Sequence, residues 1–154
     1  MDHILITGMS GVGKSSVLSE LSRRGHRTID TDYGPWVRAD GAWDEPRMAP
    51  LLSAASPVDV AGTVDNQGRF YDRFAAVILL SAPVDVLLHR LSTRTNNPYG
   101  KSERDQAEVR RYARDIEPLL RRGATLELDA CRPISKLADE IEKLAIPHGS
   151  GSAR

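Results

Sequence analysis

The stretch Gly8-Met9-Ser10-Gly11-Val12-Gly13-Lys14-Ser15 fits the pattern G-x-x-x-x-G-K-[ST] at every fixed position. It follows an apolar, β-prone run over residues 3–7 and leads into residues 15–21, whose apolar positions have helical spacing. A strand, a glycine-rich loop and a helix in this order direct backbone N–H groups and the positive end of the helix dipole toward one anion. The stretch therefore predicts a loop that binds nucleotide phosphates.

Each position of the loop has an expected part in that binding. Lys14 would reach the β- and γ-phosphates of ATP, and the Ser15 hydroxyl would bind Mg²⁺. The remaining expected nucleotide contacts come from the loop and the first helical turn: Gly8, Ser10, Gly11, Val12, Gly13 and Ser16. The alternative is a glycine-rich turn without a ligand, and the strand, loop and helix context disfavours it.

Length and composition limit the other possibilities. The chain has 154 residues, which predicts one domain over residues 1–146 followed by a flexible tail over 147–154. A formal net charge of zero argues against a nucleic-acid partner, and no apolar run approaches the length of a membrane span. Cys131 is the single cysteine, which excludes an internal disulfide. We expect a cytoplasmic monomer or homodimer, since Met1 leads directly into the first strand.

Two carboxylates follow the second expected strand, residues 26–29. In an open parallel sheet the residues just beyond the carboxyl end of a strand line the ligand crevice, so Asp30 and Asp32 should lie near the phosphates. We expect Asp30 to help hold magnesium, and Asp32 to bind the acceptor and to orient or deprotonate its hydroxyl. The alternative is that one or both carboxylates only cap a turn.

The acceptor is expected to bind to two segments in the middle of the chain. Residues 34–57 contain both tryptophans and several prolines, and form either an acceptor-binding flap with Arg38 as a cationic clamp or a plain surface connection. The third expected strand, residues 58–63, ends near Gly62, which permits close backbone approach. The loop after it would read the substrate through Asn66, Gln67 and Arg69, unless this stretch is only the start of a polar helix.

A fourth strand over residues 75–81 and a helix from Pro83 come next. Arg90 and Arg94 lie one turn apart near the end of that helix, ahead of a polar segment with proline and glycine. We interpret residues 93–103, the lid segment, as mobile. Arg94 would neutralise charge on the transferring phosphoryl group, and Arg90 would contact the nucleotide. The alternative is a solvated helix face.

The last part of the chain completes the predicted fold. We expect one long helix over residues 102–122, a fifth strand over 125–129 and an amphipathic helix over 134–144. Arg132, between the last strand and helix, would stack on the adenine or lie on the surface. The pattern predicts a three-layer α/β/α fold with a five-stranded, mostly parallel sheet.

With these motifs assembled, residues 2–145 resemble the small P-loop kinases of the shikimate, gluconate and adenylate kinase group. Asp30-Thr31-Asp32 looks like the Asp-x-Asp of shikimate kinases, a resemblance that implies magnesium for the first acid and the acceptor hydroxyl for the second. The lid segment and Arg132 are placed like the lid and the adenine-flanking loop of these kinases. Residues 66–71 and 97–101 also look like small actinobacterial kinase-like ATPases. Only Gly62-Thr63 stands where shikimate kinases carry three glycines, and no clear carboxylate clamp is present.

These observations predict an enzyme that uses ATP and Mg²⁺. The expected reaction moves the γ-phosphoryl group of ATP to a hydroxyl of a small molecule such as a nucleoside, a sugar or a sugar acid. One alternative is a nucleoside monophosphate kinase, in which arginines would clamp an acceptor phosphate. Another is a regulatory module that binds a nucleotide and has no acceptor.

Overall fold

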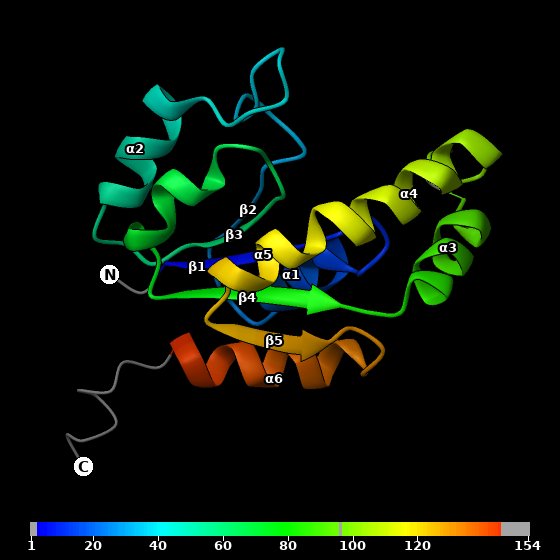
Figure 1. Cartoon of the computed structure of the whole chain (residues 1–154). Helices are drawn as coiled ribbons and strands as arrows, with labels where there is room; N and C mark the ends of the chain where they lie inside the picture. The colour runs from blue at the N-terminus through cyan, green and yellow to red at the C-terminus, as the bar shows by residue number, and fades with distance from the viewer. Residues whose placement is uncertain (1–2, 96, 146–154) are drawn as a thin grey trace.

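The computed structural model describes residues 3–95 and 97–145, and its centre is a five-stranded sheet (Figure 1). The strand order is β2-β3-β1-β4-β5, and all neighbouring pairs are parallel. The strands are β1 (Ile4–Gly8), β2 (Thr28–Asp30), β3 (Asp59–Ala61), β4 (Ala76–Ser81) and β5 (Leu126–Asp129). The predicted three-layer α/β/α fold is confirmed, with a sheet that is parallel throughout.

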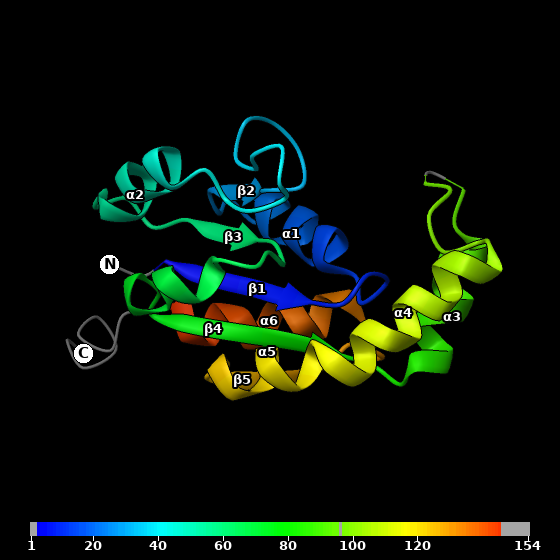
Figure 2. The same cartoon turned by 45° about the horizontal axis from the view of Figure 1, so that its top comes forward.

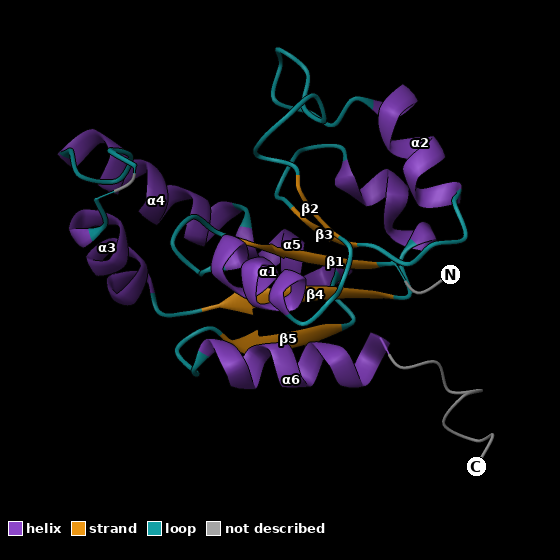
Figure 3. Cartoon of the chain, turned by 180° about the vertical axis from the view of Figure 1, so that it is seen from behind, coloured by secondary structure: helices purple, strands orange, loops and turns teal. Residues whose placement is uncertain are grey.

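One face of the sheet is covered by α1 (Lys14–Arg23) and α6 (Ile134–Ala145), which pack against each other (Figure 3). Their apolar stripes meet alternate residues of the central strands, because successive strand residues point to opposite faces. The fully buried contacts of this layer include Val17, Leu21, Leu137 and Ile141. The layer holds α1 rigidly behind the loop that precedes it.

The other face is covered by α2 (Glu45–Ser53), the 3₁₀ helix η1 (Gln67–Arg73) and α5 (Glu117–Gly123), and α5 lies opposite α1 across the sheet (Figures 1 and 3). Trp43 is fully buried in this layer and packs against the rings of Phe70 and Phe74. The segment 34–57 is therefore anchored in the core through Trp43 and the apolar face of α2, although most of its other residues are exposed, and Trp43 is no open substrate wall. Burial of an aromatic side chain of this size stabilises the folded state, and Trp43 has that role here.

The helices α3 (Val84–Thr93) and α4 (Glu103–Asp115) project beyond the carboxyl ends of the strands (Figure 2). The prediction of one helix over residues 102–122 is wrong, because the chain breaks at Ile116 into α4 and α5. Pro118 explains the break: proline lacks the N–H that would bond to the carbonyl of Arg114, and it is tolerated only in a first helical turn.

Within the described residues, no helix is long and apolar enough to cross a bilayer. The predicted tail over 147–154 and position 96 of the lid segment lie outside the described residues.

Candidate functional site

The loop between β1 and α1 has the backbone geometry that phosphate binding requires. Gly8, Gly11 and Gly13 all have positive φ angles, of 153°, 90° and 97°. A Cβ atom at Gly8 would lie 2.5 Å from the carbonyl oxygen of Leu80, so only glycine fits where β1 turns into the loop. Gly13 is the N-cap of α1 and has no side chain to occupy the first N–H groups of the helix. The helix therefore presents free donors and its positive dipole end to an anion.

Lys14 begins α1, and its ammonium group turns back over the loop. Its Nζ atom donates hydrogen bonds to the carbonyl oxygens of Gly8 at 2.7 Å and Met9 at 3.2 Å. Burial lowers the pKa of Lys14 to about 8, although the charges of Asp32 and Asp30 oppose this shift. The nearby carboxylates and the ammonium group thus form one electrostatic cluster at the carboxyl ends of the strands.

Ser15 and the two acids after β2 lie together on the same side of the loop. The Ser15 hydroxyl donates to Asp30 Oδ2 at 2.6 Å, and the N–H of Asp32 donates to Asp30 Oδ1 at 3.1 Å. Burial raises the pKa of Asp32, with Lys14 acting in the opposite direction and Asp30 adding to the rise. A carboxylate with a raised pKa holds a proton more readily, which suits it to accept one.

These residues fit a nucleotide with its magnesium ion. Mg²⁺ prefers oxygen ligands and is usually held by one or two protein groups together with phosphates and water. The hydroxyl of Ser15 and the carboxylate of Asp30 supply such a set. In the described part of the chain no group of three or more His, Cys, Asp and Glu side chains could by itself hold a metal ion.

The predicted arginines have different partners in the structure. Arg90 on α3 donates to the carbonyl oxygens of Gly11 at 3.2 Å and Val12 at 3.3 Å, and to Ala130 at 2.8 Å. Arg90 therefore links the loop to the β5–α6 connection by hydrogen bonds. Its predicted contact with a nucleotide stays a prediction.

Arg94 contacts the lid segment, and Arg132 contacts α6. Arg94 is the C-cap of α3 and donates to the carbonyl oxygen of Tyr99 at 3.1 Å, so it holds the lid segment in place. Arg132 is exposed at the start of α6 and lies 3.9 Å from Glu140. The roles predicted for both arginines, in charge neutralisation and adenine stacking, stay predictions.

The residues predicted to read the substrate have internal partners in the structure. A Cβ atom at Gly62 would lie 2.3 Å from Thr31 Oγ1, so this glycine makes room for the protein's own core. Asn66 bonds to both the N–H and the carbonyl oxygen of Trp43, at 2.9 and 3.0 Å. Gln67 is buried and bonds within the protein. These contacts give the three residues structural roles, and substrate binding by them stays a prediction.

Arg38 and Arg69 are exposed and form surface ion pairs. Arg38 lies 2.9 Å from Asp40, and Arg69 lies 3.1 Å from Glu45. Such pairs are weak and open easily, so both guanidinium groups remain accessible to an incoming anion.

The profile of a protein family described as an AAA domain matches residues 4–111. The chain belongs to this AAA domain family. The match includes the loop, Asp30, Asp32 and the lid segment, and ends before Arg132.

Curated relatives of this AAA domain protein carry nucleotide-related names. It is 30% identical over 146 residues to a nucleotide-binding protein from Thioalkalivibrio sulfidiphilus, a match that spans 86% of this chain and 50% of that protein. It is 38% identical over 79 residues to an HPr kinase/phosphorylase from Clostridium kluyveri, with coverage of 51% and 23%. The chain thus spans half or less of the length of these relatives.

Solved structures confirm the fold of the AAA domain protein. A shikimate kinase from Acinetobacter baumannii in complex with shikimate superposes with a TM-score of 0.69 at 20% identity, covering 100% of this chain and 96% of that one. A gluconokinase from Sinorhizobium meliloti 1021 gives a TM-score of 0.62 at 18% identity, with coverage of 94% and 91%. The AAA domain protein therefore has the fold of small P-loop kinases.

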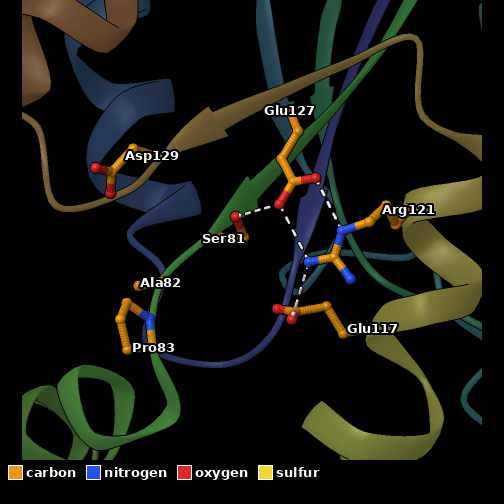
Figure 4. Close-up of a pocket in the computed structure, with 7 residues that line it drawn as sticks. All are labelled: Ser81, Ala82, Pro83, Glu117, Arg121, Glu127 and Asp129. Carbon is orange, nitrogen blue, oxygen red and sulfur yellow. Dashed lines mark hydrogen bonds and ion pairs between the residues drawn. The ribbon is translucent and has the colours of Figure 1, made fainter.

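Two cavities lie near the carboxyl end of the sheet in this AAA domain protein. One, of about 510 Å³, lies between β4, β5 and α5 (Figure 4). Its charged groups are largely paired with one another: Arg121 contacts Glu117 and Glu127, and Glu127 also accepts from Ser81. The other, of about 440 Å³, is lined by Ser15, Asp30 and the exposed Tyr33. The second cavity is the one that adjoins the predicted chemistry.

Sequence reasoning missed Thr63 in this AAA domain protein. Its hydroxyl bonds to both the N–H and the carbonyl oxygen of Gly8, the first residue of the phosphate-binding loop. The available signal was the position of Thr63 in the sequence, because residues just beyond the carboxyl end of a buried strand line the ligand crevice of a parallel sheet.

Proposed function

We propose that this AAA domain protein is an ATP-dependent phosphotransferase that moves the γ-phosphoryl group of Mg·ATP to a hydroxyl of a small molecule. The observation that carries the proposal is the cluster of Lys14, Ser15, Asp30 and Asp32 at one edge of the sheet. It combines a cation, an oxygen ligand set for magnesium and a carboxylate with a raised pKa. Phosphoryl transfer needs these three components together.

The residues would divide the chemistry as follows. Lys14 and the backbone N–H groups of the loop would stabilise the negative charge of the β- and γ-phosphates. Ser15 and Asp30 would hold magnesium, which supplies further charge neutralisation when bound. The oxygen of the acceptor hydroxyl would attack the γ-phosphorus while the bond from that phosphorus to ADP breaks, and Asp32 would accept the proton of the hydroxyl. Each proposed role is assigned to a side chain that belongs to this cluster.

The test is ADP formation from Mg·ATP across a panel of nucleosides, nucleoside monophosphates, sugars, sugar acids and hydroxylated antibiotics. We expect one acceptor class to raise ADP release, and Lys14→Ala to lower kcat/KM by at least about 100-fold, because it removes a charge aimed at the transferring group. The exposed Lys136 on α6 provides the matched control, since Lys136→Ala changes net charge equally without touching the loop.

Each outcome of the panel identifies a different function. ADP release driven by nucleoside monophosphates would replace the proposal with a nucleoside monophosphate kinase. Nucleotide binding without transfer to any member of the panel would favour a regulatory module. Full activity in Lys14→Ala would contradict the assignment of the loop as the phosphate site.

A further inference from the structure

A chain of buried and partly buried hydrogen bonds links the phosphate-binding loop to the segment after β3. Thr63 Oγ1 lies 2.6 Å from the carbonyl oxygen and 3.1 Å from the nitrogen of Gly8. It also lies 2.9 Å from the hydroxyl of Thr7, which is 3.1 Å from Gln67 Nε2. Gln67 Nε2 then lies 2.9 Å from the hydroxyl of Tyr71. Thr7 and Gln67 are almost completely buried, at 0% and 2% exposed.

Two backbone groups, the N–H of Val64 and the carbonyl of Gly8, together fix the direction of every bond in this chain. The nitrogen of Val64 lies 2.8 Å from Gln67 Oε1, and because an amide N–H can only donate, Oε1 is the acceptor. Gln67 Nε2 must then donate to Thr7, which leaves the Thr7 proton for Thr63. Thr63 in turn donates its single proton to the carbonyl of Gly8. The hydroxyl of Thr63 thus has one available arrangement.

Thr63 and Lys14 converge on the same atom. The Gly8 carbonyl oxygen accepts from Thr63 Oγ1 at 2.6 Å and from Lys14 Nζ at 2.7 Å, which occupies both of its lone pairs. A fully satisfied buried network rigidifies its members, whereas a broken one leaves polar groups unpaired. The position of Gly8 is therefore fixed from the β3 side by Thr63.

We propose that Thr63 is a positioning residue, which sets the start of the phosphate-binding loop and couples it to residues 63–71. The inference rests on the proposed function in that the loop must bind nucleotide phosphates. Thr63 acts through Gly8 and Lys14 and touches no reacting atom. Through Thr7 and Gln67, a shift of residues 63–71 on acceptor binding would reach the loop.

Thr63→Val tests the proposal because it keeps the side-chain shape and removes the hydroxyl. We expect the Kd for Mg·ADP, measured by titration calorimetry, to rise about tenfold, which corresponds to about 1.4 kcal/mol. Thr63→Ser restores the hydroxyl and should stay within about threefold of the unmodified protein.

Thr125 supplies a matched control within the same sheet. Its hydroxyl bridges the N–H and carbonyl of Val77 at 2.9 and 3.1 Å, the same arrangement at the amino end of the strands. Thr125→Val should lower thermal stability and leave the Kd for Mg·ADP unchanged. A purely structural role for Thr63 would make the two valine variants behave alike.

The outcomes separate this inference from the proposed function. Tight Mg·ADP binding by a folded Thr63→Val protein would overturn the inference alone, while binding without turnover of any acceptor would contradict only the proposed function. If Thr63→Val does not fold, amide hydrogen exchange of the unmodified protein decides. Mg·ADP should slow exchange in residues 64–71 as well as 8–15, and protection confined to the loop would overturn the coupling.

Discussion

Asp32 differs from Asp30 although the two acids are only two residues apart. Asp30 accepts hydrogen bonds from the Ser15 hydroxyl and from the backbone N–H of Asp32. Asp32 is instead affected mainly by burial, which raises its pKa, against the attraction of Lys14. Two carboxylates in different environments can take different parts in one reaction, one as a metal ligand and one as a base.

Asp32→Asn should therefore reduce turnover far more than nucleotide binding. We expect kcat to fall by about 100-fold or more, because an amide cannot accept the proton of the acceptor hydroxyl. The Kd for Mg·ADP should change little. Steady-state kinetics with the acceptor found in the panel, together with calorimetry, measure the two quantities.

Asp72→Asn is the matched control for this experiment, since Asp72 is exposed on η1 and the change removes one carboxylate charge equally. Its activity should equal that of the unmodified protein. An unchanged kcat in Asp32→Asn would remove Asp32 from the proposed chemistry.

Residues 97–101 of the lid segment are hydrogen-bonded to the helices on either side of them. Lys101 Nζ donates to the carbonyl oxygens of Ser92 and Arg94 near the end of α3, at 2.9 and 2.6 Å. The N–H of Gly100 donates to Asp105 in the first turn of α4 at 3.0 Å. These bonds join α3, residues 97–101 and α4, so any closure over the site would move this unit together.

Gly100→Ala tests how tightly the lid segment packs on α3. Gly100 has a φ of 94°, and an added Cβ atom would lie 2.5 Å from Leu91 Cβ. Backbone strain and overpacking should lower the free energy of unfolding by about 1–3 kcal/mol, as measured in urea. Gly68 has open space around its Cβ position, so Gly68→Ala should leave stability nearly unchanged. Equal stability of the two variants would contradict this account.

An ion-pair network joins α1 and α6, which lie next to each other on one face of the sheet. Arg24 lies 2.8 Å from each of three carboxylates, in Glu20 of α1 and in Asp139 and Glu142 of α6. Hydrogen bonds from Arg23 and then Arg24 lower the pKa of Glu20 to about 2, and those from His26 and then Arg24 lower the pKa of Glu142. Paired acids with lowered pKa values stabilise the fold while they remain ionised.

Arg24→Met should lower the Tm by a few degrees near neutral pH, because it removes the guanidinium group that contacts all three carboxylates. Arg23 is mostly exposed and reaches only Glu20 within α1, so Arg23→Met should have a smaller effect.

The pH dependence supplies the check on this network. Because the folded pKa values lie below the ordinary 4.5 of a glutamate, the contribution is complete above that pH and is lost as the pH falls toward about 2. In thermal melts the Tm gap between Arg24→Met and the unmodified protein should narrow between about pH 5 and about pH 3. A gap that is constant with pH would show that Arg24 acts only through packing.

The sequence by itself determined the fold class and the centre of the site. Gly8, Lys14 and Ser15 could be predicted to lie together at the start of a helix because the motif and local chain geometry alone specify this arrangement, while anion binding by them stays a prediction. The apolar runs of β1 and β4 likewise predicted buried parallel strands, since hydrophobic patterning is a local property. Asp30 and Asp32 followed from their place after a strand.

Only the tertiary structure decided which of the other polar and aromatic residues face the site. Trp43, Asn66 and Gln67 have partners far from them in the sequence, and Thr63 meets Gly8 across 55 residues. A hydrogen bond between distant segments leaves no local periodicity, so the same glutamine could serve a ligand or the core. The fold gives these side chains internal partners, because a polar group removed from water must bond to a neighbour that the fold supplies.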